Sequence, residues 1–123
     1  MDEIRQPILN LVARHKNEVQ PQICPCGSAV RILTKADSDI AGFHITTIRD
    51  AAWHYHKKTT EIYHVLEGKG RLEVGDACIP LTPGMTVLIP VGVPHRGEGD
   101  FKTIIVSVPP FDAEDEFCWE PAP

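Results

Sequence analysis

The chain has 123 residues, of which 42% are hydrophobic and 24% are charged, and its formal net charge at pH 7 is −5. This length suits one domain spanning residues 1–123, and the composition is that of a globular protein with one core. Nucleic-acid binding needs clustered Lys and Arg. The acidic balance, with no basic run longer than Lys57-Lys58, therefore argues against a nucleic-acid partner.

The sequence also argues against secretion and membrane insertion. The first residues lack the basic stretch and apolar run of a secretory signal, and no segment approaches the roughly 18 consecutive apolar residues of a membrane helix. The four cysteines contain no CxxC pair, and the single proline between Cys24 and Cys26 leaves poor disulfide geometry. We therefore expect a plain loop at Cys24-Pro25-Cys26 and four reduced thiols in a cytoplasmic protein.

Near the start, apolar residues recur at helical spacing: Ile4, Ile8, Leu11 and Val12. Pro7 suits an early helical position because its missing N–H is not needed there. The pattern predicts a short amphipathic helix over about residues 7–17. Pro21 and the stretch Cys24-Pro25-Cys26-Gly27 then break the chain into a loop.

From about residue 29 the sequence changes to short β-rich runs separated by turn formers. The expected strands are 29–34, 42–49, 61–67, 70–74, 77–81, 86–90 and 101–108. The separators are Gly68-Lys69-Gly70, Gly75-Asp76, Pro83-Gly84 and Gly92-Val93-Pro94. Regular strand spacing without intervening helices favours an antiparallel sandwich or barrel with a core over about 29–110. The acidic, proline-rich tail 109–123 is expected to lie across the surface.

One expected strand is apolar on both faces. By alternation, Glu61, Tyr63 and Val65 share one face, while Ile62, His64 and Leu66 share the other. An isolated barrel needs a polar outer face. We therefore expect the N-terminal helix, a second subunit or both to cover it, which favours a homodimer.

Two histidines two residues apart suggest a metal site. On a strand, His54 and His56 point to the same face, and the polar stretch 57–60 can turn the chain so that Glu61 stands beside them. Two imidazoles and a carboxylate suit a divalent transition metal, and His95 could complete the set. Taken singly, such residues are ordinary surface or core side chains.

The spacing of these residues resembles the cupin motifs. His54-Tyr55-His56, four residues, Glu61, six residues and Gly68 resemble the first motif. Gly84, five residues, Pro90-Val91-Gly92, two residues and His95 resemble the second, and 15 residues separate Gly68 from Gly84. The resemblance covers residues 43–108 and extends to small single-barrel members of the cupin superfamily. It implies an all-β double-stranded β-helix, a jelly roll, with the short N-terminal helix added.

The resemblance also assigns the ligands. All four positions of the family's metal ligands hold the expected residue type, namely His54, His56, Glu61 and His95. Two other positions depart from the pattern, because Ile48 replaces a frequent glycine and Gly99 a frequent asparagine. The implied cofactor is one divalent ion, Fe(II), Mn(II), Ni(II), Co(II) or Zn(II), with positions left open for substrate or water.

Other residues could take part in chemistry. Tyr63 shares the face of Glu61, and in some lyases that resemble cupins a tyrosine in this neighbourhood serves as a base; the alternative is a core aromatic. His44 also falls on a plausible inward face, whereas His64 should face away from the metal. Trp53 and Trp119 either line the barrel mouth or pack.

Two functions remain open at this point. The first is a metal-dependent oxygenase, isomerase or lyase acting on a small polar molecule in the barrel. The second is a non-catalytic module that binds or senses a small ligand. The resemblance supports both, because fold does not fix function. An open, solvent-facing metal position with a base nearby would favour the enzyme.

Overall fold

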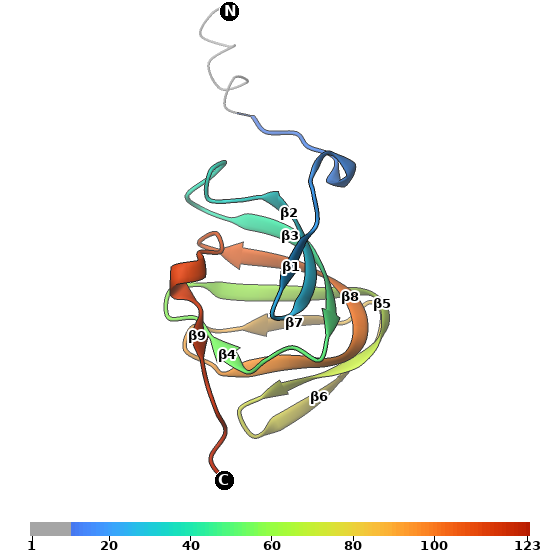
Figure 1. Cartoon of the computed structure of the whole chain (residues 1–123), viewed down its shortest axis with the longest axis vertical. Coiled ribbons are helices and arrows are strands. Elements are labelled where there is room, and N and C mark those ends of the chain that lie inside the picture. Colours follow the sequence, from blue (N-terminus) through green and yellow to red (C-terminus); the bar gives the residue numbers. More distant parts are fainter. Residues whose placement is uncertain (1–10) are drawn as a thin grey trace, which may run out of the picture.

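The computed structural model describes residues 11–123, which form a curled antiparallel β-sheet (Figure 1). The elements are η1 (Lys16–Glu18), β1 (Gln22–Cys24), β2 (Gly27–Leu33), β3 (Gly42–Arg49), β4 (His54–Tyr55), β5 (Thr60–Val74), β6 (Ala77–Leu81), β7 (Thr86–Ile89), β8 (His95–Val108), η2 (Ala113–Asp115) and β9 (Phe117–Cys118). The prediction of an all-β jelly roll is confirmed.

The two longest strands, β5 and β8, form the frame of the barrel. They pair antiparallel from Thr60 opposite Val108 to Val74 opposite His95. The other edge of β8 pairs with β3, and the other edge of β5 pairs with β7 and then with β6. These two strands therefore take part in both layers of the roll, as the continuous orange and yellow-green ribbons of Figure 1 show.

The two runs expected at 61–67 and 70–74 are one bent strand. Gly68-Lys69-Gly70 does not end β5, because β8 continues to pair with it through this stretch. The register shifts between Val65 and Glu67, which marks a bulge, and bulges bend strands. The prediction of a separator here was wrong: these glycines allow a bend and a close strand contact instead.

A close backbone contact between β5 and β8 explains one departure from the cupin pattern. Gly99 lies opposite Gly70 with φ at 103°, a conformation that favours glycine. A Cβ added at Gly99 would lie 2.7 Å from the Gly70 Cα. At the other departure, Ile48 is buried, and its Cγ2 fills the space where a Cβ on Gly97 would lie. Neither departure touches the four candidate ligands.

The core lies between the two layers and follows the alternation read from the sequence. Along β3, β5 and β8, buried residues alternate with more exposed ones. The buried apolar cluster consists of Ile48, Ala51, Tyr63, Val65, Leu72, Leu81, Ile89, Phe101 and Ile105. The inward face of β5 is thus the one that carries Glu61 and Tyr63, as predicted.

The helix expected over about 7–17 is absent from the part that the structure describes. Residues 7–10 lie outside the described residues, 11–15 have no regular structure, and 16–18 form the 3-10 turn η1. Of the expected apolar stripe, only Leu11 and Val12 lie within the described residues, and they are 67% and 40% exposed. A short segment without a packed face gains too little to offset helix nucleation. No helix within 11–123 is long and apolar enough to cross a membrane.

The prediction of four reduced thiols was wrong for one pair. Cys24 and Cys26 form a disulfide, with their Cα atoms 5.1 Å apart. The reason is the hairpin between β1 and β2, in which Cys24 pairs with Gly27 and the chain turns at Pro25-Cys26. The turn brings the two Cα atoms into the usual range for a disulfide, which an extended Cys-Pro-Cys segment would not do.

The C-terminal tail is built into the fold. β9 pairs with β4, with Tyr55 opposite Phe117 and His54 opposite Cys118. Asp115, in η2, is buried, although the sequence suggested a tail lying across the surface. The apolar residues among the acidic ones explain the difference, because Phe117 stacks on Tyr55 and Trp119 packs on Trp53 with ring centroids 4.8 Å apart.

Candidate metal centre

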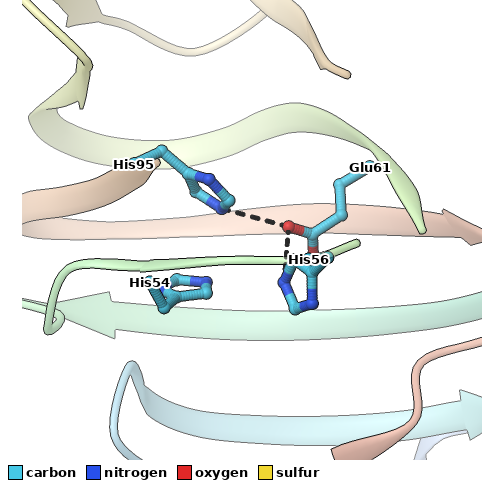
Figure 2. Close-up of side chains that lie close together, drawn as sticks. All are labelled: His54, His56, Glu61 and His95. Atoms are coloured by element: carbon cyan, nitrogen blue, oxygen red, sulfur yellow. Dashed lines mark hydrogen bonds and ion pairs between the residues drawn. The ribbon is translucent and has the colours of Figure 1, made fainter. Parts of the chain in front are cut away.

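The four residues predicted to bind metal converge at one end of the barrel. One potential ligand atom from each of His54, His56, Glu61 and His95 lies within 4.8 Å of the others. Figure 2 shows the three imidazoles and the carboxylate directed toward a common point. His56, Glu61 and His95 are buried, and His54 is half-buried.

Backbone pairing explains how residues distant in sequence meet here. His54 on β4 lies opposite His95, the first residue of β8. Glu61 is the second residue of β5 and pairs with Ser107 of β8 and with Ile89 of β7. His56 follows β4 on the same side as His54, because side chains two residues apart on an extended chain share a face.

Each imidazole is oriented by a hydrogen bond to a backbone carbonyl. The Nδ1 atoms of His54, His56 and His95 lie 2.9 Å from the carbonyl oxygens of Ala52, Asp115 and Val93, respectively. A carbonyl only accepts, so each Nδ1 carries the proton and donates it. The lone pair of each neutral ring is then on Nε2, which faces the common point, as in metal-binding histidines.

The inward atoms are crowded around one carboxylate oxygen. Glu61 Oε1 lies 3.1 Å from His95 Nε2 and 3.2 Å from His56 Nε2. With Glu61 ionised, the first contact is a hydrogen bond only when His95 Nε2 carries a proton; with a lone pair on Nε2, the two atoms need a cation between them. His56 Nε2 is misaligned for a hydrogen bond and, within residues 11–123, is a buried nitrogen without a hydrogen-bond partner. Such an orphaned nitrogen beside a carboxylate is what a metal cation would satisfy.

The charges of these groups are coupled. Burial alone would raise the pKa of Glu61, but the close contacts and charges of His56 and His95 outweigh it and hold this pKa well below its usual range. Burial lowers the pKa of His56, yet the neighbouring Glu61 brings it above 6.5 overall. Burial and the proximity of His95 lower the pKa of His54. The carboxylate is therefore ionised and can serve as an anionic ligand.

A cavity of about 50 Å³, partly open to solvent, leads from this cluster into the barrel. Tyr63 and His44 both line it, as alternation suggested, together with Thr46, Ile105 and Ser107. His64 lies on the opposite face of β5, where its Nδ1 is 2.8 Å from Thr86 Oγ1. The cavity thus offers ionisable side chains beside the ligand cluster and room for a small molecule.

Tyr63 and His44 on the cavity wall are both neutral near pH 7. Burial, and then the negative charges of Glu61 and Glu116, raise the pKa of Tyr63 well above 10. Burial, and then the positive charge of Arg31, lower the pKa of His44 to about 4. The phenol can therefore donate a proton, and the imidazole can accept one.

Sequence reasoning missed three residues of the tail that shape the site. The Glu116 carboxylate lies 3.9 Å from His54 Nε2. The Asp115 carboxylate accepts hydrogen bonds from the backbone N–H groups of Lys57 and Lys58, which fixes the turn after His56. The ring of Phe111 packs edge-on against His56. The only sequence signal was the presence of aromatic residues in an otherwise polar tail.

Comparisons with known proteins agree with this geometry. A family model described as the cupin domain matches residues 44–109, more than half of the chain. The chain belongs to the cupin domain family. The match contains all four residues of the cluster, so the cupin motifs read from the sequence are those that build this site.

Relatives and solved structures extend the likeness to most of this cupin. An uncharacterized protein of Methanocaldococcus jannaschii is 25% identical, with 87% of this chain and 94% of the relative covered. A protein from Planctomyces limnophilus is 33% identical, with a TM-score of 0.82 and with 87% and 96% of the two chains covered. Pac13, a nucleoside dehydratase from Streptomyces, has a TM-score of 0.80 at 11% identity, with 92% and 94% covered. At that identity, the likeness to Pac13 concerns the fold alone.

Proposed function

We propose that this cupin is a metal-dependent enzyme that acts on a small polar molecule. The observation that carries the proposal is the arrangement of the three imidazoles: each Nδ1 is hydrogen-bonded to a backbone carbonyl, and Nε2 of His56 and of His95 lies within 3.2 Å of Glu61 Oε1. His54 adds a ligand atom within 4.8 Å of the others. Three imidazoles and one carboxylate fit Fe(II), Mn(II), Ni(II), Co(II) or Zn(II) and leave positions for a substrate oxygen.

The donor set defines what a bound ion would contribute. A divalent ion held by these four residues would act as a Lewis acid on a substrate oxygen. Tyr63 would stay protonated and donate to a developing negative charge or to a leaving group. Neutral His44, which like Tyr63 pairs with Ile105 of β8, could accept a proton. Phe111 and Ile105 would limit the access of water.

Proton-transfer groups beside the ligand cluster favour a lyase or an isomerase over the non-catalytic module. A module that only stores or senses a ligand does not need a buried phenol and a neutral imidazole lining the same cavity. The reaction class is thus proposed from the residues of this chain. The names of the structural neighbours do not contribute, because their likeness at low identity concerns the fold.

The test is elemental analysis of protein purified without a histidine tag and without added metal. We expect about one transition metal per chain in the wild type and none in the double variant His56→Ala/His95→Ala, because two Nε2 ligands are removed. His64→Ala is the matched control, since His64 lies on the outer face and should leave metal content unchanged. Wild-type stoichiometry in the double variant, or no metal uptake by the wild type after reconstitution, would refute the proposal.

A further inference from the structure

The wall of the cavity on β2 carries a single cation. Arg31 lies opposite His44 in the pairing of β2 with β3, and both residues line the cavity. Its guanidinium carbon lies 4.2 Å from the centroid of the Phe111 ring. No other Lys or Arg lines this cavity among the described residues. Arg31 is therefore the only fixed positive charge that a ligand in this cavity would meet.

This cation lacks a counter-charge within the part of the chain that the structure describes. Arg31 Nε is fully buried and has no hydrogen-bond partner, and no described carboxylate comes within ion-pair distance of its guanidinium. Burial lowers the pKa of Arg31, and the more distant charge of Glu116 opposes this effect only in part. Arg31 as a whole is only half-buried, but its buried Nε is a donor without a partner among the described residues, and a ligand anion would satisfy it.

Phe111 connects this cation to the metal cluster. Its ring contacts the guanidinium on one face and meets the edges of His44 and His56, with ring centroids 5.9 Å and 6.4 Å away. One aromatic ring thus lies between Arg31 and a proposed metal ligand. A small molecule in the cavity can reach both.

We propose that Arg31 binds the carboxylate of a substrate whose hydroxyl or carbonyl oxygen lies at the metal cluster. The substrate class is therefore a small hydroxy or keto acid. The inference rests on the proposed function and deepens it. A planar guanidinium matches a planar carboxylate in a two-point contact. A phosphate dianion fits less well, because Arg31 is a single cation and Glu61 and Glu116 line the same cavity.

The test uses three hydroxy acids of increasing length and the matched diols that lack the carboxylate. The acids are glycolate, 3-hydroxypropionate and 4-hydroxybutyrate, and the diols are ethylene glycol, 1,3-propanediol and 1,4-butanediol. Binding to zinc-loaded and zinc-free protein is measured by saturation-transfer NMR and calorimetry. The variants are Arg31→Met, Arg31→Lys and, as the matched control, Arg49→Met, which removes an exposed arginine away from the cavity.

We expect at least one acid to bind the wild type tenfold or more tightly than its diol. This preference should disappear in Arg31→Met, return in part in Arg31→Lys and persist in Arg49→Met, with zinc content unchanged throughout. Equal binding of acid and diol by the wild type, or an unchanged preference in Arg31→Met, would overturn the inference. If the wild type takes up no zinc but zinc-free protein keeps an Arg31-dependent preference, the carboxylate site stands and the proposed metal function fails.

Discussion

The candidate site is assembled from two halves that are held in different ways. Glu61 and His95 belong to β5 and β8, the longest strands, which are fixed by a continuous ladder of backbone hydrogen bonds. His54 lies on the two-residue strand β4, and His56 follows it. These two are held by β9 and by Asp115 of the C-terminal tail. One half of the ligand set thus depends on the barrel and the other on a short segment added to it.

The difference indicates where substitutions should damage the fold and where they should damage only the site. We call Glu61, His95 and the strands β5 and β8 the ladder half, and a change there should mainly lower the free energy of unfolding, because it removes buried contacts. We call His54, His56 and the C-terminal segment that holds them the tail half. A change there should mainly lower metal affinity, because it loosens the orientation of two imidazoles.

The largest effect on stability is expected for Phe101→Ala. Phe101 is 1% exposed and packs at the close crossing of β5 and β8. Its removal leaves a cavity in the ladder half and should lower the free energy of unfolding by about 3–5 kcal/mol, measured by urea denaturation. Phe101→Leu, which keeps most of the apolar volume, should cost less than about 1.5 kcal/mol. A loss below 1 kcal/mol in the alanine variant would show that this crossing does not hold the fold together.

The next largest effect is a loss of metal affinity on substitution in the tail half. Asp115→Ala removes the acceptor of the Lys57 and Lys58 N–H groups and disturbs the carbonyl that orients His56. We expect metal affinity to fall by about 10–100-fold, as for other groups that orient metal ligands, while the circular dichroism spectrum of the barrel is retained. Competition with a chelator measures the affinity. Glu114→Ala, an exposed neighbour, is the control, and an equal loss in both variants would contradict the role of Asp115.

A smaller effect concerns acid stability. His44 in the folded chain has a pKa of about 4, whereas the usual pKa of a histidine is about 6.5. Between these pH values the unfolded chain binds a proton that the folded chain does not, so stability falls as the pH drops from 6.5 toward 4. Between pH 7 and 4.5, the free energy of unfolding of His44→Gln should decrease by about 2 kcal/mol less than that of the wild type. Urea denaturation with a chelator present measures this difference. Parallel curves for wild type and variant would disprove the assignment.

The smallest effect on stability is expected on the outward face of the ladder half. Ile62 on β5 pairs with Leu88 on β7 and Val106 on β8, and Leu88 is 60% exposed. The predicted homodimer would bury this apolar face. Leu88→Asp should change the free energy of unfolding of one chain by no more than about 0.5 kcal/mol yet yield a monomer in sedimentation experiments. Ile40→Asp, at another exposed apolar position, should leave the dimer intact. A monomeric wild type would rule out the dimer.

Sequence reasoning recovered the ladder half almost completely. Alternation placed Glu61 and Tyr63 inward and His64 outward, and the spacing of the cupin motifs brought His95 to the histidine pair. These features depend on local periodicity and on a pattern of fixed spacing. For the same reason β3, β6 and β7 were predicted close to their observed bounds, whereas β5 was predicted as two strands and β8 was predicted to begin six residues too late.

The tail half could not be predicted because it depends on contacts between distant segments. Nothing local marks Asp115 as the acceptor for a turn 57 residues earlier. The unpaired state of Arg31 depends on which residues the fold brings near it, and the disulfide of Cys24 and Cys26 depends on a hairpin that was read as a loop. The described part of the expected helix, residues 11–17, is not α-helical for the converse reason, since the periodicity was local and Leu11 is 67% exposed.

The position of Asp115 also sets an order of events during synthesis. A growing polypeptide that already contains His56 must extend by another 59 residues before the carbonyl that orients this imidazole exists. The barrel strands are all made by then, because β8 ends before η2 begins. If the cluster binds the proposed ion, capture at full affinity follows translation of the barrel strands and cannot guide their early folding.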